Sequence, residues 1–142
     1  MLLMLGSGSA QAANCKVTVT PLDFGIYNPG SAAPLDVAGN LDVRCVGGAG
    51  SFVVTISPGT NGSFFPRQLA SGPYLMQYNL YSDPARSQIW GDGTGGTSVN
   101  SGNKPSAGKP LSFSFPIYGR IFPRQSVAAG VYSDSLLVTT VF

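Results

Sequence analysis

The sequence contains no histidine and no glutamate, and all six of its acidic residues are aspartates. Without histidine there is no imidazole to serve as the base of a catalytic triad or as a zinc ligand, and without glutamate there is no Glu-based acid catalysis. Nothing in the sequence places two aspartates together, and no catalytic nucleophile–base pair is recognisable. We therefore expect a protein that is not an enzyme, acts on no small-molecule substrate and uses neither cofactor nor metal.

Charge of either sign is also scarce. Charged residues make up 10% of the chain, against roughly a quarter in ordinary soluble proteins. The net charge is +2 and the basic residues are scattered, so no basic patch for nucleic acid is predicted. Hydrophobic residues reach 43%, which excludes a disordered composition, and 19 glycines and 11 prolines supply many turns. This balance favours a single all-β domain.

The N-terminal segment has the features of an export signal. Residues 1–5 are a short apolar run, and residues 6–12 end in the small-x-small pattern of a signal peptidase site. We interpret residues 1–12 as a signal peptide that stands apart from the fold, and residues 13–142 as the mature domain. The segment lacks a basic region, so a loose N-terminal tail is the alternative. A membrane span needs about 20 apolar residues, and none is predicted.

Cys15 and Cys45 are the only cysteines in the chain. Each lies in a run where apolar and polar residues alternate, and each falls on the apolar side of its run. An exported chain with an even cysteine count favours a disulfide, which would close a loop of about thirty residues. The alternatives are two free buried thiols and, less favoured, a two-ligand metal site.

Alternation between apolar and polar residues also predicts the other strands. Gly, Pro, Asn and Asp clusters separate these runs, so the pattern indicates a β-sandwich of about seven strands. Pro116 indicates an edge or a bulge in its strand. The expected strands lie around residues 15–20, 35–45, 52–56, 74–81, 89–90, 111–117 and 136–142.

The predicted last strand, residues 136–142, is apolar on both faces. Leu136, Val138 and Phe142 fall on one face, and Leu137 and Val141 on the other. Such a strand is expected to be covered on both faces and paired on both edges, either within its own sheet or by another chain.

Residues 91–105 form a Gly-, Ser- and Asn-rich stretch that we interpret as a flexible hairpin loop. Its match to G-x-G-x-x-G does not predict a nucleotide site, because a polar stretch and a proline follow where that motif requires a helix. Asp92 alone cannot form a calcium site. The nearby Tyr78, Tyr81 and Trp90 are a possible ligand platform for a sugar, but core packing is the favoured interpretation.

A set of residues with a characteristic order and spacing extends over nearly all of the predicted mature chain. The set consists of Cys15, Phe24, Gly25, Tyr27, Cys45, Tyr78, Asn79, Leu80, Tyr81, Trp90, Gly91, Tyr118, Gly119, Arg120, Ile121, Gly130, Tyr132, Asp134, Leu136, Val138 and Thr139. The order and spacing of these residues match the spore coat protein U domain family, and the sequence therefore resembles that family.

The resemblance implies a secreted, non-enzymatic protein that crosses the periplasm to the cell surface. The family includes spore-coat proteins and subunits of archaic chaperone–usher pili. In such pili each subunit is an incomplete immunoglobulin-like sandwich, which a periplasmic chaperone and then the next subunit complete with a donor strand. The implied partners are therefore a chaperone, an usher and other pilus subunits. We expect Leu136, Val138 and Phe142 to carry the subunit and chaperone interaction.

The chain departs from the polymerising subunits at one point. Only Ala13 and Asn14 separate the predicted cleavage site from Cys15, so we expect a chain that accepts a strand but donates none. The sequence therefore predicts a tip-proximal fibre subunit that serves adhesion or biofilm formation. A self-complete spore or surface coat protein and a carbohydrate-binding module remain the alternatives.

Overall fold

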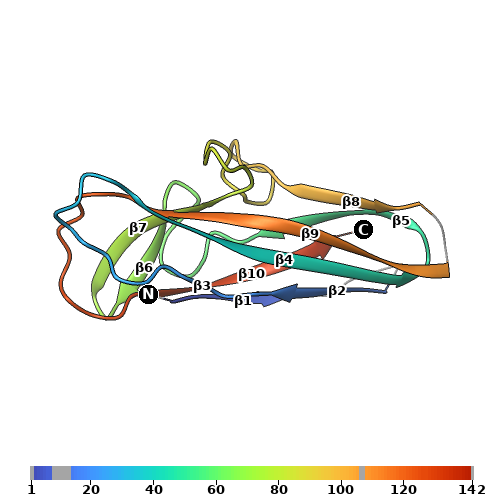
Figure 1. Ribbon diagram of the computed structural model, residues 1–142, viewed down its shortest axis with the longest axis horizontal. Helices are drawn as coiled ribbons and strands as arrows, with labels where there is room; N and C mark the ends of the chain where they lie inside the picture. The colour runs from blue at the N-terminus through green and yellow to red at the C-terminus, as the bar shows by residue number, and fades with distance from the viewer. Residues whose placement is uncertain (1, 8–13, 106–107, 142) are drawn as a thin grey trace.

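The computed structural model describes residues 2–7, 14–105 and 108–141, and the regular structure in these ranges consists of ten β-strands (Figure 1). The prediction of an all-β sandwich is confirmed, with more strands than the expected seven. Within the described ranges there is no helix that could span a membrane. The strands are β1 (Leu2–Ser7), β2 (Asn14–Val19), β3 (Leu22–Asp23), β4 (Leu35–Gly47), β5 (Gly50–Ile56), β6 (Arg67–Ser71), β7 (Tyr74–Tyr81), β8 (Asn100–Lys104), β9 (Gly108–Ile121) and β10 (Ser133–Val141).

Strands β2 and β4 show how alternation directs side chains to the core. Leu41, Val43 and Cys45 of β4 are buried, whereas the intervening Asp42 and Arg44 are exposed. The two strands pair antiparallel with Cys15 directly opposite Cys45, and the two cysteines form a disulfide. The predicted disulfide is therefore confirmed, and the alternatives of free thiols or a metal pair are excluded.

The strands form two layers that pack face to face. Hydrogen bonding runs in the order β2-β4-β9-β7-β6-β10-β1-β3, and β5 pairs with both β10 and β8. The Phe52 ring on β5 lies 4.9 Å from the Phe113 ring on β9, although these strands are not paired. These edge-to-face rings therefore join the two layers across the core. Figure 1 shows the long β4–β9 ladder along the molecule.

Four strands were not predicted, namely β1, β3, β6 and β8. β6 has a weak apolar pattern, and β8 lies inside the Gly-, Ser- and Asn-rich stretch that we interpreted as a flexible loop. That interpretation is wrong for Asn100–Lys104, because β8 pairs by its backbone with β5 over five residues. The short strand expected at Ile89 and Trp90 is present as two isolated bridges.

Pro116 lies in β9 where the strand pairs with β4. On its other edge β9 pairs with β7, but only from Tyr118 onward, so β7 does not pair with β9 at Pro116. The expectation of an edge position is confirmed, and it is the position where a residue without an N–H group disturbs no ladder.

The N-terminal segment differs from expectation. Residues 1–12 were expected to stand apart from the fold, but Leu2–Ser7 forms β1 and pairs with two other strands. The signal peptide itself stays a prediction. The position of β1 defines the candidate site.

Candidate functional site along strand β10

Strand β10 is paired on both edges. On one edge, Val138–Val141 pairs antiparallel with β5, and Ser133 pairs with Ala70 of β6. On the other edge, Ser133–Val138 pairs in parallel with β1. The two edges of β10 thus have partners from distant parts of the chain, one of them from its first residues.

Strand β1 fills the position between β10 and β3. Its second partner is β3, where Leu2 stands opposite Asp23 and Leu3 opposite Leu22. Leu22 on β3 and Leu136 on β10 are both buried core residues on either side of this position. Without a strand here, the backbone edges of β10 and β3 would lose their partners beside apolar core residues. We call this position, bounded by β10 and β3, the strand groove.

Only one face of β10 is covered. Leu136 and Val138 are buried, as expected for their face, but Leu137 is 51% exposed and Val141 is 49% exposed. The expectation that both faces are covered is therefore wrong, because the second sandwich layer lies against one side of β10 alone. Phe142 lies outside the described residues. The role of Leu136, Val138 and Phe142 in binding a subunit or chaperone stays a prediction.

A buried carboxylate anchors the start of β10. Asp134 is 2% exposed and accepts a 2.5 Å hydrogen bond from the Tyr78 hydroxyl. It also accepts hydrogen bonds from the backbone N–H and hydroxyl of Thr60 and from the Asn61 amide. A Cβ atom at Gly59 would lie within 2.2 Å of this carboxylate, so the loop approaches closely only because Gly59 has none. Burial, followed by the negative charge of Asp134, raises the pKa of Tyr78 well above its usual value.

A buried guanidinium holds the neighbouring loops. Arg67 at the start of β6 is fully buried and donates hydrogen bonds to the carbonyls of Ile56, Ser57 and Trp90 and to the Asn79 side chain. Burial lowers the pKa of Arg67 to about 10, so the group stays charged at neutral pH. The Arg67 N–H groups thus provide hydrogen-bond donors for buried backbone carbonyls at the end of β5. These bonds hold the end of β5 in place beside β10.

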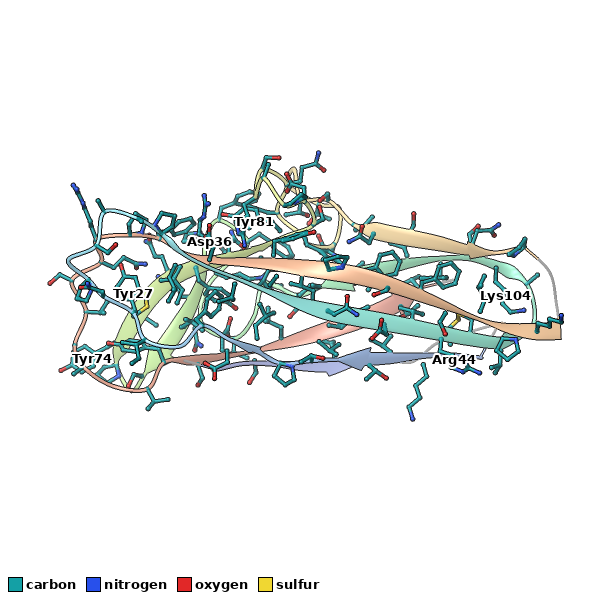
Figure 2. The ribbon with its side chains drawn as sticks, viewed as in Figure 1. Tyr27, Asp36, Arg44, Tyr74, Tyr81 and Lys104 are labelled. Atoms are coloured by element: carbon teal, nitrogen blue, oxygen red, sulfur yellow. A yellow bond between two sulfur atoms is a disulfide. The ribbon has the colours of Figure 1, made fainter. Side chains whose placement is uncertain are left out.

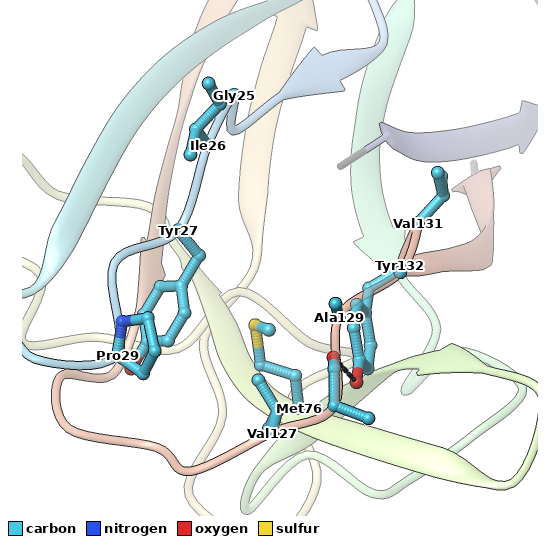
Figure 3. Close-up of a pocket in the computed structure, with 11 residues that line it drawn as sticks. Gly25, Ile26, Tyr27, Pro29, Met76, Val127, Ala129, Val131 and Tyr132 are labelled. Atoms are coloured by element: carbon cyan, nitrogen blue, oxygen red, sulfur yellow. Dashed lines mark hydrogen bonds between the residues drawn. The ribbon is translucent and has the colours of Figure 1, made fainter.

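A cavity of about 400 Å³ opens beside the strand groove, at the end where β1 begins (Figure 3). Gly25 and Ile26, which follow β3, line one side, and Val131 and Tyr132, which precede β10, line the other. Met76 of β7 also lines it. The cavity therefore continues the groove beyond the first residue of β1 and is mainly apolar.

Hydrogen bonds fix the loops around this cavity. The Tyr27 hydroxyl donates to the Phe122 carbonyl at 2.7 Å and accepts from the Gln125 N–H. The Tyr132 hydroxyl donates to the Ala128 carbonyl at 2.6 Å, the interaction dashed in Figure 3. Figure 2 places Tyr27 and Tyr74 at this end of the sandwich, and Arg44 and Lys104 at the opposite end.

The possible ligand platform is contradicted. Tyr78 and Trp90 are fully buried, and Tyr81 is 7% exposed. The Tyr78 hydroxyl is bonded to Asp134 and the Trp90 indole N–H to the Val54 carbonyl, so their polar atoms also face inward. None of these three residues presents an aromatic face to a sugar, and core packing, the favoured interpretation, is what the structure shows.

The described part of the chain holds no group of three or more His, Cys, Asp or Glu side chains that could bind a metal ion. The buried Asp134 and Arg67 were not identified from the sequence as site residues. The one available signal was the place of Asp134 between apolar positions of its strand, on the same face as Leu136. The absence of catalysis stays a prediction.

Comparison with known proteins gives a family and a fold. Residues 3–139 match the model of the Spore Coat Protein U domain. No curated protein matches the chain. One similar solved structure is the CsuC-CsuE chaperone-tip adhesion subunit pre-assembly complex from archaic chaperone-usher Csu pili of Acinetobacter baumannii, with 17% identity and a TM-score of 0.62. The match covers 92% of this chain but only 40% of that chain, and at this identity it shows the fold alone. Because the family model covers almost all of the sequence, the chain belongs to the Spore Coat Protein U domain family.

Proposed function

We propose that this protein is a secreted structural subunit of a bacterial surface fibre of the archaic chaperone–usher class. The observation that carries the proposal is the position of β1, which pairs with β10 on one side and β3 on the other. This strand comes from residues 1–12, the segment that the sequence predicts to be removed on export. In the processed chain the strand groove would then need a strand from another polypeptide.

The proposed partners are a periplasmic chaperone, an usher and other pilus subunits. The structurally similar protein is described as a subunit held by its chaperone before assembly, which supports a strand-lending partner for this fold. Passage through the periplasm also accounts for the Cys15–Cys45 disulfide, because disulfides form and persist in oxidising compartments.

We also propose a tip-proximal place in the fibre and a role in adhesion or biofilm formation. The similar structure contains a tip adhesion subunit, which supports the position. Apolar side chains are presented at the end of the sandwich that holds the cavity, where Ile26 is 94% exposed and Val131 is 77% exposed. Exposed apolar residues around a cavity are a common feature of interaction surfaces.

A self-complete coat protein is the second candidate. The observation that favours it is the same β1 strand, because a chain that keeps residues 1–12 fills the strand groove from within. The two candidates therefore differ in whether this segment remains attached and in place. The carbohydrate-binding alternative rested on Tyr78, Tyr81 and Trp90, which are buried.

Expression in the periplasm with and without an archaic-type chaperone tests the proposal. The subunit proposal predicts that the processed chain accumulates only with the chaperone and is purified as a one-to-one complex. The N-terminal sequence of the purified chain would show whether residues 1–12 are gone. A processed chain that accumulates alone as a soluble, cooperatively folding monomer would contradict the subunit proposal and favour the coat protein.

A further inference from the structure

The first residues of the chain occupy the strand groove as a paired strand. Six consecutive residues of β1 pair with β10, from Leu2 opposite Ser133 to Ser7 opposite Val138. Two of them also pair with β3. Leu2 and Leu3 are thereby paired on both edges, as in an internal strand of a sheet, and Met4–Ser7 add four further pairs with β10 alone.

The apolar residues of β1 are in register with a buried part of β10. Leu5 stands opposite Leu136, which is 4% exposed, and Met4 stands opposite the exposed Ser135. A strand groove bounded by apolar core residues requires an apolar occupant, since a polar one would be desolvated without compensation. The run from Leu2 to Leu5 meets this requirement.

The connection between β1 and the rest of the fold is short and contains the predicted cleavage site. Only residues 8–13 separate β1 from β2, and these are Gly, Ser, Ala and Gln residues. A covalent tether as short as this gives its end an effective concentration on the order of millimolar. An external strand of similar intrinsic affinity at micromolar concentration would therefore lose the competition for the groove. The predicted cleavage after Ala12 would cut this tether.

We propose that Leu2–Ser7 is an internal plug of the strand groove and that cleavage within residues 8–13 opens the groove to a strand from another chain. The unprocessed protein is self-complemented and excludes external strands. After cleavage the same apolar segment binds only as a separate peptide and can be displaced. The inference rests on the proposed function only for the identity of the displacing strand.

The experiment uses the full chain with a specific protease site inserted between Ser9 and Ala10. The probe is a fluorescent synthetic peptide with the sequence of residues 1–9, and its binding is followed by anisotropy before and after cleavage. The uncut chain should bind the probe at least about 10²-fold more weakly than the cut chain, because cleavage removes the advantage of the tether. The cut chain should also show a melting temperature that falls on dilution.

Two matched variants test the plug without cleavage. Leu5→Asp should release the plug, so that the uncut chain binds the probe, whereas Met4→Asp should leave the groove closed. The contrast follows from the register, since Leu5 is opposite a buried residue of β10 and Met4 is opposite an exposed one. Equal probe binding by the cut and uncut chains would overturn the proposal. A cut chain that never exchanges the probe and melts independently of concentration would overturn it as well.

The probe-binding experiment tests the plug independently of the proposed function, because it involves neither a chaperone nor a fibre. Probe exchange after cleavage without any chaperone complex in the periplasm would support the plug and count against the pilus subunit. If the chain formed a chaperone complex but its uncut form bound the probe freely, the result would support the pilus subunit and count against the plug.

Discussion

The hydroxyl of Tyr78 on β7 donates a 2.5 Å hydrogen bond to the carboxylate of Asp134 on β10, deep in the core. The two residues lie 56 positions apart in the sequence, and the bond ties the start of the strand that borders the groove to the opposite part of the fold. The bond thereby holds in place the end of β10 that pairs with the first residues of β1.

Removing the Tyr78 hydroxyl should therefore weaken the fold at β10. Tyr78→Phe leaves Asp134 buried with one partner fewer, so we expect the free energy of unfolding to fall by about 1–3 kcal/mol. Tyr74→Phe is the matched control, because Tyr74 is exposed. Denaturant unfolding measures both, and equal values for the two variants would contradict a role for the buried bond.

The raised pKa of Tyr78 predicts a loss of stability in alkali. A folded pKa above the unfolded value means that the folded state holds its proton more tightly. The contribution is fully present below about pH 10, the usual pKa of tyrosine, and is lost as the pH rises above it. Absorbance titration should show a tyrosine that ionises only upon unfolding. In Tyr78→Phe this late step should disappear.

The ion pair of Asp36 and Arg120 should stabilise the protein at neutral pH but not in strong acid. The Arg120 guanidinium donates hydrogen bonds of 2.7 and 2.9 Å to the Asp36 carboxylate and holds its pKa below the usual range. A lowered folded pKa contributes stability above the unfolded pKa of about 3.9, and that stability is lost as the pH falls through the folded pKa. Arg120→Gln should raise the pKa of Asp36 in an NMR titration. Arg44→Gln, on a side chain bonded to Ser112, should leave it unchanged.

Charge on the buried face of β10 should prevent the protein from accumulating. Leu136→Asp or Val138→Asp places an unpaired carboxylate in the core, and we expect the free energy of unfolding to fall by more than about 4 kcal/mol. Leu137→Asp is the control, because that side chain is half exposed on the same strand. Soluble yield from an oxidising compartment is the readout. If all three variants accumulated equally, the assignment of the two faces would be contradicted.

The disulfide should contribute strongly because it joins directly opposite residues and closes a loop of 30 residues. Cys45→Ala should lower the free energy of unfolding by about 2–5 kcal/mol. Thiol labelling of the unfolded, unreduced protein should find no free thiol, and two labelled thiols per chain would contradict the bond. Lys16→Ala, beside Cys15, serves as the control.

Sequence reasoning succeeded where side chains alternate over a half-buried strand. The phases of Cys15 and Cys45 predicted the disulfide, and alternation predicted the strands β4 and β9, although not their pairing. It failed for β8, since Asn100–Lys104 pairs through its backbone and carries no apolar pattern. Pairing of that kind depends on a neighbouring strand rather than on the residues themselves.

The candidate site was predicted only in part. Leu136 and Val138 were placed on the correct face, but the exposed Leu137 and Val141 were expected to be covered. Apolar character alone cannot show whether a second layer lies against a strand. The burial of Arg67 could not be predicted, because its partners are carbonyl groups of Ile56, Ser57 and Trp90 that only the folded chain brings together.

The central claim is that the strand groove beside β10 receives a strand from another chain. Photo-crosslinking from Ser135, an exposed residue on the part of β10 that borders the groove, tests it most directly in cells. We expect a crosslink to a chaperone in the periplasm and to another subunit at the cell surface, with residues 1–12 absent from the processed protein. Crosslinks confined to residues 2–7 of the same chain, in both locations, would contradict the account and leave a self-complete coat protein.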